Sequence, residues 1–223
     1  FIYYIFTKKI MATKGDSVYK HKSNSREYLA ALTSYPSYCK LLYGKGKAYD
    51  NLINWIMSFV NDSNEETLIP DLKEIAKQSR VTYSNIAKYL QEIYLDIFDL
   101  NFDEPRKFVS DNDRVCCLYI NYLGCFTYFN IGLNTIPKQN EQFIFSFVNP
   151  KVGSSRFWVK NVRHEIFNGK QIVSIDLTHE RPNLYLQLLK EKAFLNNELH
   201  WKEYYGELDL DTKERLISKN KSL

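Results

Sequence analysis

Apolar residues recur at helical spacing in two stretches of the first half of the chain. Between residues 48 and 61, Leu52, Trp55, Ile56 and Phe59 fall on one side of a helix. This spacing predicts a first helix, which the polar residues that follow would end. Between residues 71 and 93 the apolar positions form two shorter helical stripes. A few polar residues separate them, which predicts two helices joined by a tight turn.

The helix expected from Asp71 has the signature of a capped start. Asp71 is followed three residues later by Glu74, and Pro70 precedes the pair, so free backbone amides would be satisfied by a capping box. Ile75 and Ala76 share the apolar face with Leu72, and the small Ala76 would let a second helix cross closely.

The second helix is expected to begin after a turn over residues 79–81. Val81 would be the buried apolar residue of this turn, and Thr82 would cap the helix through its hydroxyl. Ile86, Leu90 and Ile93 then fall at i, i+4 and i+7 on the packed side. We therefore expect the apolar residues of both helices to be buried together with Trp55.

The pattern changes to that of strands after residue 94. Residues 95–133 are rich in aromatic and β-branched residues around a polar, proline-bearing stretch, which predicts a hairpin with a long tip. Further strands are expected over 142–148, 156–166 and 170–177, and helical spacing returns over 183–197 and 211–220. The aromatic strands 125–131 and 142–148 could stack single-stranded bases. Because 142–148 carries no charge, we assign its rings to the core instead.

The predicted fold class is α+β, a winged-helix-like helical module followed by a small antiparallel β-sheet or barrel and C-terminal helices. Three regions follow from this order. Residues 1–47 are expected to form a basic arm and lead-in without regular structure, 48–121 the helical module, and 122–223 a β-rich domain with the C-terminal helices.

The helical pair of residues 71–93 resembles the helix-turn-helix of winged-helix DNA-binding proteins. The resemblance rests on a helix ending in Glu74-Ile75-Ala76, a turn closed by Val81, a Thr82 cap and a second helix containing Tyr89-Leu90, and it covers residues 48–121. The strands expected over 95–100 and 114–121 stand where this family has its wing. Arg80 departs from the pattern, because the family often has Gly at this position of the turn.

The resemblance implies that the second helix enters the major groove of double-stranded DNA. Asn85 would pair with adenine, and Lys88 with guanine or a phosphate. Thr82 and Ser84 would hold the DNA backbone, and Tyr83 lies on the same exposed first turn. The implied DNA-binding residues are Thr82, Tyr83, Ser84, Asn85 and Lys88.

Charge is distributed unevenly along the chain. Residues 1–47 carry nine Lys or Arg against two Asp or Glu, whereas residues 48–100 carry four against nine. A basic arm of this kind can lie along phosphates or enter a minor groove, or it can be a solvated tail. Helical pairs also serve as protein contacts, and residues 82–94 have no net charge. A protein-interaction or assembly module is therefore the alternative function.

Catalytic and metal-binding patterns are weak. His164 and Glu165 resemble the start of a zinc-binding H-E-x-x-H motif, but residue 168 is Asn. The four cysteines have no C-x-x-C spacing, and no nucleophile stands near a base, so we expect no enzyme activity, no metal and no cofactor. Residues 1–10 precede the first Met and are interpreted as upstream translation, not as a signal peptide.

The expected protein is therefore a cytoplasmic DNA-binding protein. No apolar run approaches the roughly 18 to 20 residues of a membrane helix, so no membrane association is expected. We interpret it as a transcriptional regulator or a DNA-maintenance factor of a mobile element or phage, an impression given by residues 136–166. Double-stranded DNA is the expected partner, and a homodimer is a second expectation.

Overall fold

The computed structural model describes residues 21–62, 68–111, 113–167, 169–205 and 208–221. The chain divides into two compact units, with the division after Glu180. The expected boundary at residue 122 falls inside the first unit, at the end of a strand in the middle of a hairpin. Residues 1–20 of the expected basic arm lie outside the described part of the chain.

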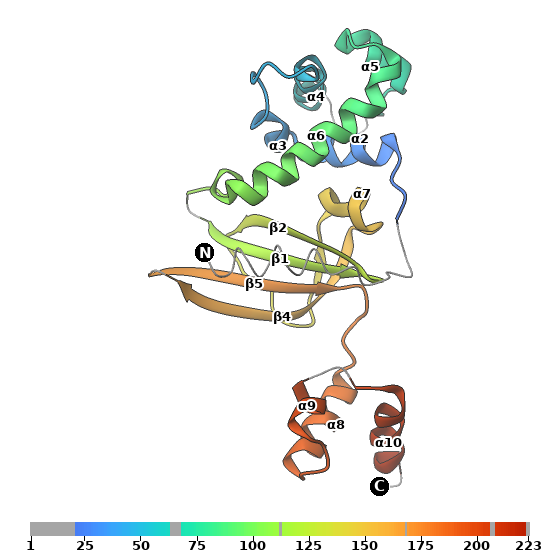
Figure 1. Cartoon of the computed structure of the whole chain (residues 1–223), viewed down its shortest axis with the longest axis vertical. Coiled ribbons are helices and arrows are strands. Elements are labelled where there is room, and N and C mark those ends of the chain that lie inside the picture. Colours follow the sequence, from blue (N-terminus) through green and yellow to red (C-terminus); the bar gives the residue numbers. More distant parts are fainter. Residues whose placement is uncertain (1–20, 63–67, 112, 168, 206–207, 222–223) are drawn as a thin grey trace. The chain divides into compact units, whose positions relative to one another are not determined.

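The first unit combines a helical layer with one sheet (Figure 1). The prediction of an irregular lead-in over residues 21–47 was wrong, because this stretch contains α2 (Ser25–Ser34) and α3 (Pro36–Lys40). Asn24 caps α2 by accepting bonds from two backbone amides, and Glu27 completes the capping box. Pro36 fits the first turn of α3, where its missing N–H costs nothing. The serine and tyrosine of this stretch therefore mark helix ends and a packed face.

The three helices expected between residues 48 and 93 are confirmed as α4 (Asp50–Asp62), α5 (Leu72–Ser79) and α6 (Tyr83–Asp103). The last of them is longer than predicted, because the strand expected over residues 95–100 is helical. Ile86, Leu90, Ile93 and Ile97 continue one helical stripe, all fully buried. This continuous packed face prevails over the strand propensity of the aromatic residues around it.

The first hairpin of the sheet lies later in the chain than predicted. After a short 3-10 helix, η1 (Pro105–Phe108), β1 (Arg114–Tyr122) pairs antiparallel with β2 (Cys125–Leu133). Leu123 and Gly124 form the two-residue turn between them, both with positive φ. Turns of this backbone match the twist of paired strands. The long polar tip expected around residue 108 is instead the connection from helix to sheet.

The sheet has five strands in the order β2-β1-β5-β4-β3. It is mixed and not antiparallel throughout, because β1 and β5 (Lys170–Thr178) run parallel. β4 (Arg156–Phe167) pairs antiparallel with β5 and with the short β3 (Gln142–Ile144). The described helices of this unit lie on one side of the sheet, with α7 (Asn149–Val152) close to it (Figure 1).

The strand predicted over residues 142–148 ends early. Only three residues pair with β4, and Ser146–Val148 form a 3-10 helix, η2. The bend places the fully buried Phe147 ring in contact with the rings of Tyr94 and Phe129. The centroid of the Phe147 ring lies 5.1 Å from each of the other two ring centroids. The Tyr94 hydroxyl also donates a hydrogen bond to the Phe147 carbonyl at 3.0 Å. Burial of this ring in an aromatic cluster therefore decides the local conformation, as expected for a residue of the core.

A buried pair of asparagines forms hydrogen bonds between the end of α6 and β2. The Asn101 side chain donates to the Asn130 carbonyl and accepts from the Asn130 amide, both at 2.8 Å. The Asn130 side chain in turn contacts the Tyr128 hydroxyl and accepts from the Cys117 thiol at 3.0 Å. Burial raises the pKa of the Cys117 thiol to about 11, so it stays protonated at neutral pH.

The second unit is a small helical assembly of α8 (Leu184–Leu195), α9 (Trp201–Tyr205) and α10 (Leu210–Lys221). The two helical stretches predicted after Pro182 are thus confirmed. Among its described residues the buried apolar cluster comprises Leu189, Ala193, Leu199, Leu208 and Leu216. Leu184 and Leu188, which share a helical stripe in the sequence, are both more than half exposed.

Candidate nucleic-acid interface

The turn between α5 and α6 has the hydrogen bonds of a Schellman motif. Arg80 adopts the left-handed conformation with φ 56° and ψ 31°. The Val81 amide donates to the Ala76 carbonyl at 3.0 Å, and the Arg80 amide donates to the Lys77 carbonyl at 3.3 Å. This pair of bonds closes a helix end whose carbonyls would otherwise lack donors. The winged-helix resemblance predicts a left-handed residue at this position, and Arg80 occupies it without glycine's freedom.

The apolar residues of the two helices pack as the sequence predicts. Ile75, Ile86, Leu90 and Ile93 are fully buried, Trp55 is 8% exposed, and the half-buried Val81 packs against the same cluster. Asp71 accepts bonds from the amides of Lys73 and Glu74, which confirms it as the cap of α5. The Glu74 half of the predicted capping box is not formed, because the Glu74 carboxylate accepts a bond from the Gln78 side chain instead. The Trp55 indole donates a hydrogen bond to the Gln78 side chain at 2.7 Å, which joins α4 to α5. The pair is therefore held in one geometry by both packing and hydrogen bonds.

The residues expected to contact DNA lie on the first turns of α6, with different degrees of exposure. Thr82, Tyr83, Ser84 and Lys88 are exposed, whereas Asn85 is half-buried. Thr82 occupies the N-cap position, but the predicted cap bond from its hydroxyl is absent, since its side chain accepts no bond there. Its carbonyl instead accepts from the Asn85 amide at 2.9 Å. The Thr82 side chain is thus not engaged in capping.

The exposed face of α6 contains two residues that the sequence-based prediction missed. At about 100° per residue, Ser84, Ala87, Lys88 and Gln91 lie on one side of the helix, opposite the buried Ile86 and Leu90. All four are exposed. Their i, i+3, i+4 and i+7 spacing could have identified Ala87 and Gln91. The exposed face therefore extends one turn beyond the residues predicted from the resemblance.

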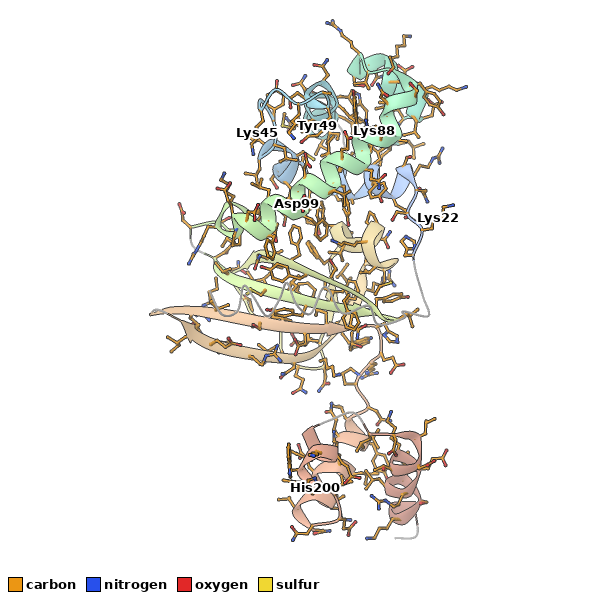
Figure 2. The ribbon with its side chains drawn as sticks, in the orientation of Figure 1. Lys22, Lys45, Tyr49, Lys88, Asp99 and His200 are labelled. Atoms are coloured by element: carbon orange, nitrogen blue, oxygen red, sulfur yellow. The ribbon has the colours of Figure 1, made fainter. Side chains whose placement is uncertain are left out.

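Charge separates along the pair of helices. Residues 73–91 carry four Lys or Arg against one Glu, and residues 92–104 carry five Asp or Glu and no Lys or Arg. Lys88 lies on the part of α6 near α5, and Asp99 lies on the part nearer the sheet (Figure 2). The side chains of Lys73, Lys77, Arg80 and Lys88 are all exposed. An anionic partner would therefore meet this surface at α5 and the first turns of α6.

The basic and acidic parts of α6 meet at Glu92. The Lys88 ammonium lies 3.6 Å from the Glu92 carboxylate one turn further along. Next to it, Asp96 accepts a hydrogen bond from the Tyr49 hydroxyl and lies 3.8 Å from the Lys47 ammonium. Burial, followed by the nearby Asp96, raises the pKa of Tyr49 above its ordinary range. The contacts of Asp96 hold α6 beside Lys47 and Tyr49, which lie just before α4. The two ion pairs partly neutralise Glu92 and Asp96.

The hairpin that follows α6 belongs to the central sheet. In the resemblance on which the DNA-binding prediction rests, a wing would follow the second helix at once. Here η1 intervenes, and β1 pairs on its other side with β5. The strand expected at residues 95–100 is absent because α6 occupies this stretch. A wing role for the β1–β2 hairpin stays a prediction.

Other kinds of site have little support within the described residues. No group of three or more His, Cys, Asp or Glu side chains is arranged there to hold a metal ion. His164 bonds to Gln171 at 2.9 Å across the β4–β5 hairpin. None of the helices searched, all from the described ranges, combines the length and apolar character needed to cross a membrane.

Comparison with known proteins does not assign the chain to a family. No protein-family model, no curated protein and no solved structure matches the sequence or the fold.

Proposed function

We propose that the first unit binds double-stranded DNA through α5, the turn and the first turns of α6. The observation that carries the proposal is the exposed face of Ser84, Ala87, Lys88 and Gln91, presented on a rigid helix pair. Helices of this kind enter the major groove with their amino-terminal residues toward the base edges. The protein would act as a transcriptional regulator or a DNA-maintenance factor.

The exposed side chains suit the two parts of such an interface. Glutamine can make paired hydrogen bonds with adenine, lysine can bond guanine, and a small alanine can contact the thymine methyl group. Lys73, Lys77 and Arg80 lie on the α5 side and would contact phosphates, which carry affinity without sequence preference. Asn85, being half-buried, would contribute at the border of this surface.

The experiment is a binding titration on a duplex selected from a random pool and on its scrambled version. Removing Lys77 and Lys88 together, as a Lys77→Ala, Lys88→Ala protein, should weaken binding to both duplexes. It should also flatten the log-log salt dependence by about 0.9 for each phosphate that is no longer neutralised. Gln91→Ala should instead reduce the preference for the selected duplex, by about 1 to 3 kcal/mol if the hydrogen bonds to the base are paired.

A matched control removes the same charge elsewhere. Lys107 forms an ion pair with Glu104, the residue before η1, as Lys88 does with Glu92 on α6, and Lys138 is exposed like Lys77. The Lys107→Ala, Lys138→Ala protein should bind DNA as the wild type does. If the wild type binds neither duplex more tightly than about 0.1 mM at physiological salt, DNA is not the partner. The helix pair would then serve as a protein-interaction module.

A further inference from the structure

The exposed side of α6 changes charge along its length. At about 100° per residue, its residues Ser84, Lys88, Gln91, Leu95 and Asp99 lie within about 80° of one another around the helix. All five are exposed, and we call them the outer stripe. The stripe has a lysine in its first half and an aspartate in its second half, nearer the sheet (Figure 2). A partner that followed the whole stripe would therefore meet both signs of charge.

Glu92 lies where the charge changes. It is about 40° from Lys88 around the helix and about 6 Å further along the axis. Its carboxylate lies 3.6 Å from the Lys88 ammonium, and its side chain stays 42% exposed. Beyond Glu92, α6 contains Asp96, Asp99 and Asp103 and no Lys or Arg. Glu92 is thus the first of the carboxylates that an anionic partner bound at Lys88 would meet.

We propose that Glu92 ends the DNA surface of α6 and lowers its affinity for DNA. This inference rests on the DNA binding proposed above and assigns a repulsive role to a residue outside the proposed contacts. In the free protein the Glu92 carboxylate attracts the Lys88 ammonium. In the complex Lys88 turns to DNA, and the carboxylate is left beside the phosphates, which it repels. Only residues 83–91 of the helix then meet DNA.

The distance along the helix decides which carboxylate acts on bound DNA. At 1.5 Å per residue, Asp99 lies about 16 Å beyond Lys88, whereas Glu92 lies about 6 Å beyond it. The Debye length is about 8 Å at physiological ionic strength. A phosphate at Lys88 is therefore within the field of Glu92 and largely screened from Asp99. A helix lying lengthwise in the groove would instead bring Asp99 directly against DNA.

The ion pair itself does not keep Lys88 from DNA. Exposed pairs one turn apart on a helix are weak, because water and salt screen them and long side chains lose freedom in forming them. A phosphate can therefore replace Glu92 as the partner of Lys88. The cost arises afterwards, since the carboxylate cannot leave the surface. Removing the charge of Glu92 should for this reason tighten DNA binding.

The test compares Glu92→Gln with Asp99→Asn in titrations of the selected and the scrambled duplex at several salt concentrations. The two variants are matched, because each removes one carboxylate that acts on one lysine, Lys88 or Lys151. Glu92→Gln should bind both duplexes about three- to tenfold more tightly at physiological salt. It should also steepen the log-log salt dependence by up to about 0.9. Asp99→Asn should change the dissociation constant less than about twofold.

A variant that keeps the charge separates the carboxylate of Glu92 from its place in the helix. Glu92→Asp should bind DNA within about twofold of the wild type, because a negative charge remains beside the phosphates. Thermal denaturation should place the melting temperatures of all three variants within about 3 °C of the wild type. A change in affinity then reports on charge and not on folding.

Three results would overturn the inference while leaving DNA binding intact. Glu92→Gln could bind as the wild type does, which would place Glu92 outside the field of bound DNA. Asp99→Asn could tighten binding as much as Glu92→Gln, which would show that the helix lies lengthwise in the groove. Glu92→Asp could tighten binding as much as Glu92→Gln, which would exclude the charge as the cause. A wild type that binds neither duplex would instead remove the proposed function, and this inference with it.

Discussion

The two halves of α6 serve different purposes within one continuous helix. In the first half, residues 83–91, the packed side rests on α5 and the opposite side is exposed. In the second half, residues 92–103, the helix contacts β2 and buries Tyr94, Phe98 and Asn101. The difference shows that a long helix can be anchored at one end and presented at the other. Substitutions on the exposed side of residues 83–91 should therefore change binding more than stability. Substitutions at the buried positions should change stability more than binding.

The largest effect is expected from Ile86→Asp. Ile86 is fully buried between α5 and α6, so the change would bury a carboxylate without a partner. We expect the free energy of unfolding to fall by about 4 kcal/mol or more. Chemical denaturation measures it. Ala87→Asp, at the exposed neighbouring position, should be nearly neutral. An Ile86→Asp protein that melts normally would contradict the helix-pair packing.

Asn101→Ala should have the next largest effect, at the anchored end. It removes both bonds to the Asn130 backbone and leaves those buried groups unpaired. We expect a loss of about 2 to 4 kcal/mol of unfolding free energy. Asp103→Ala, two residues further along and exposed, is the control and should change stability little. Equal stability of the two variants would show that water replaces the amide.

Arg80→Gly should separate stability from binding. Glycine adopts the left-handed conformation of the turn without the Cβ penalty, so we expect about 0.5 to 1 kcal/mol of added stability. The same change removes a cation from the proposed DNA surface and should weaken binding. Thermal denaturation and a DNA titration on one preparation test both parts. Arg80→Lys should restore the wild-type salt dependence, and a failure to do so would argue against a phosphate contact at this position.

Lys88→Ala should have the smallest effect on stability. Its ion pair with Glu92 joins two largely exposed side chains, 67% and 42% accessible, and such pairs contribute less than about 0.5 kcal/mol. DNA affinity should nevertheless fall. A loss of unfolding free energy larger than the loss of DNA-binding free energy would contradict this division between the two halves of α6.

The sequence predicts the helix pair well because its apolar residues recur at helical spacing on both sides of the turn. Ile75, Ile86, Leu90 and Ile93 can share a core only as two helices joined near residue 80, and the structure confirms this arrangement. The capping role of Asp71 was equally predictable, since the short Asp side chain can accept hydrogen bonds from the free backbone amides at a helix start.

The errors arise where burial overrides local preference. Residues 95–100 look like a strand, but Ile97 and Phe98 complete the stripe begun by Ile86. Residues 145–148 also look like a strand, but Phe147 turns into an aromatic cluster supplied by distant parts of the chain. The parallel pairing of β1 with β5 depends on which hairpins meet, and no single segment contains that information. Gln91 was missed for a simpler reason, because the exposed face was not followed beyond Lys88.

The Asn101 amide has a consequence for solubility as well as for stability. β2 is a border strand of the sheet, and the backbone groups along such a strand are a template for another chain. Asn101 occupies both polar groups of Asn130 and so blocks strand addition at that point. At the opposite border, β3 is only three residues long before the chain bends away. The fold thus limits strand addition at Asn130 of β2, and it keeps β3 too short to be a long template for another chain.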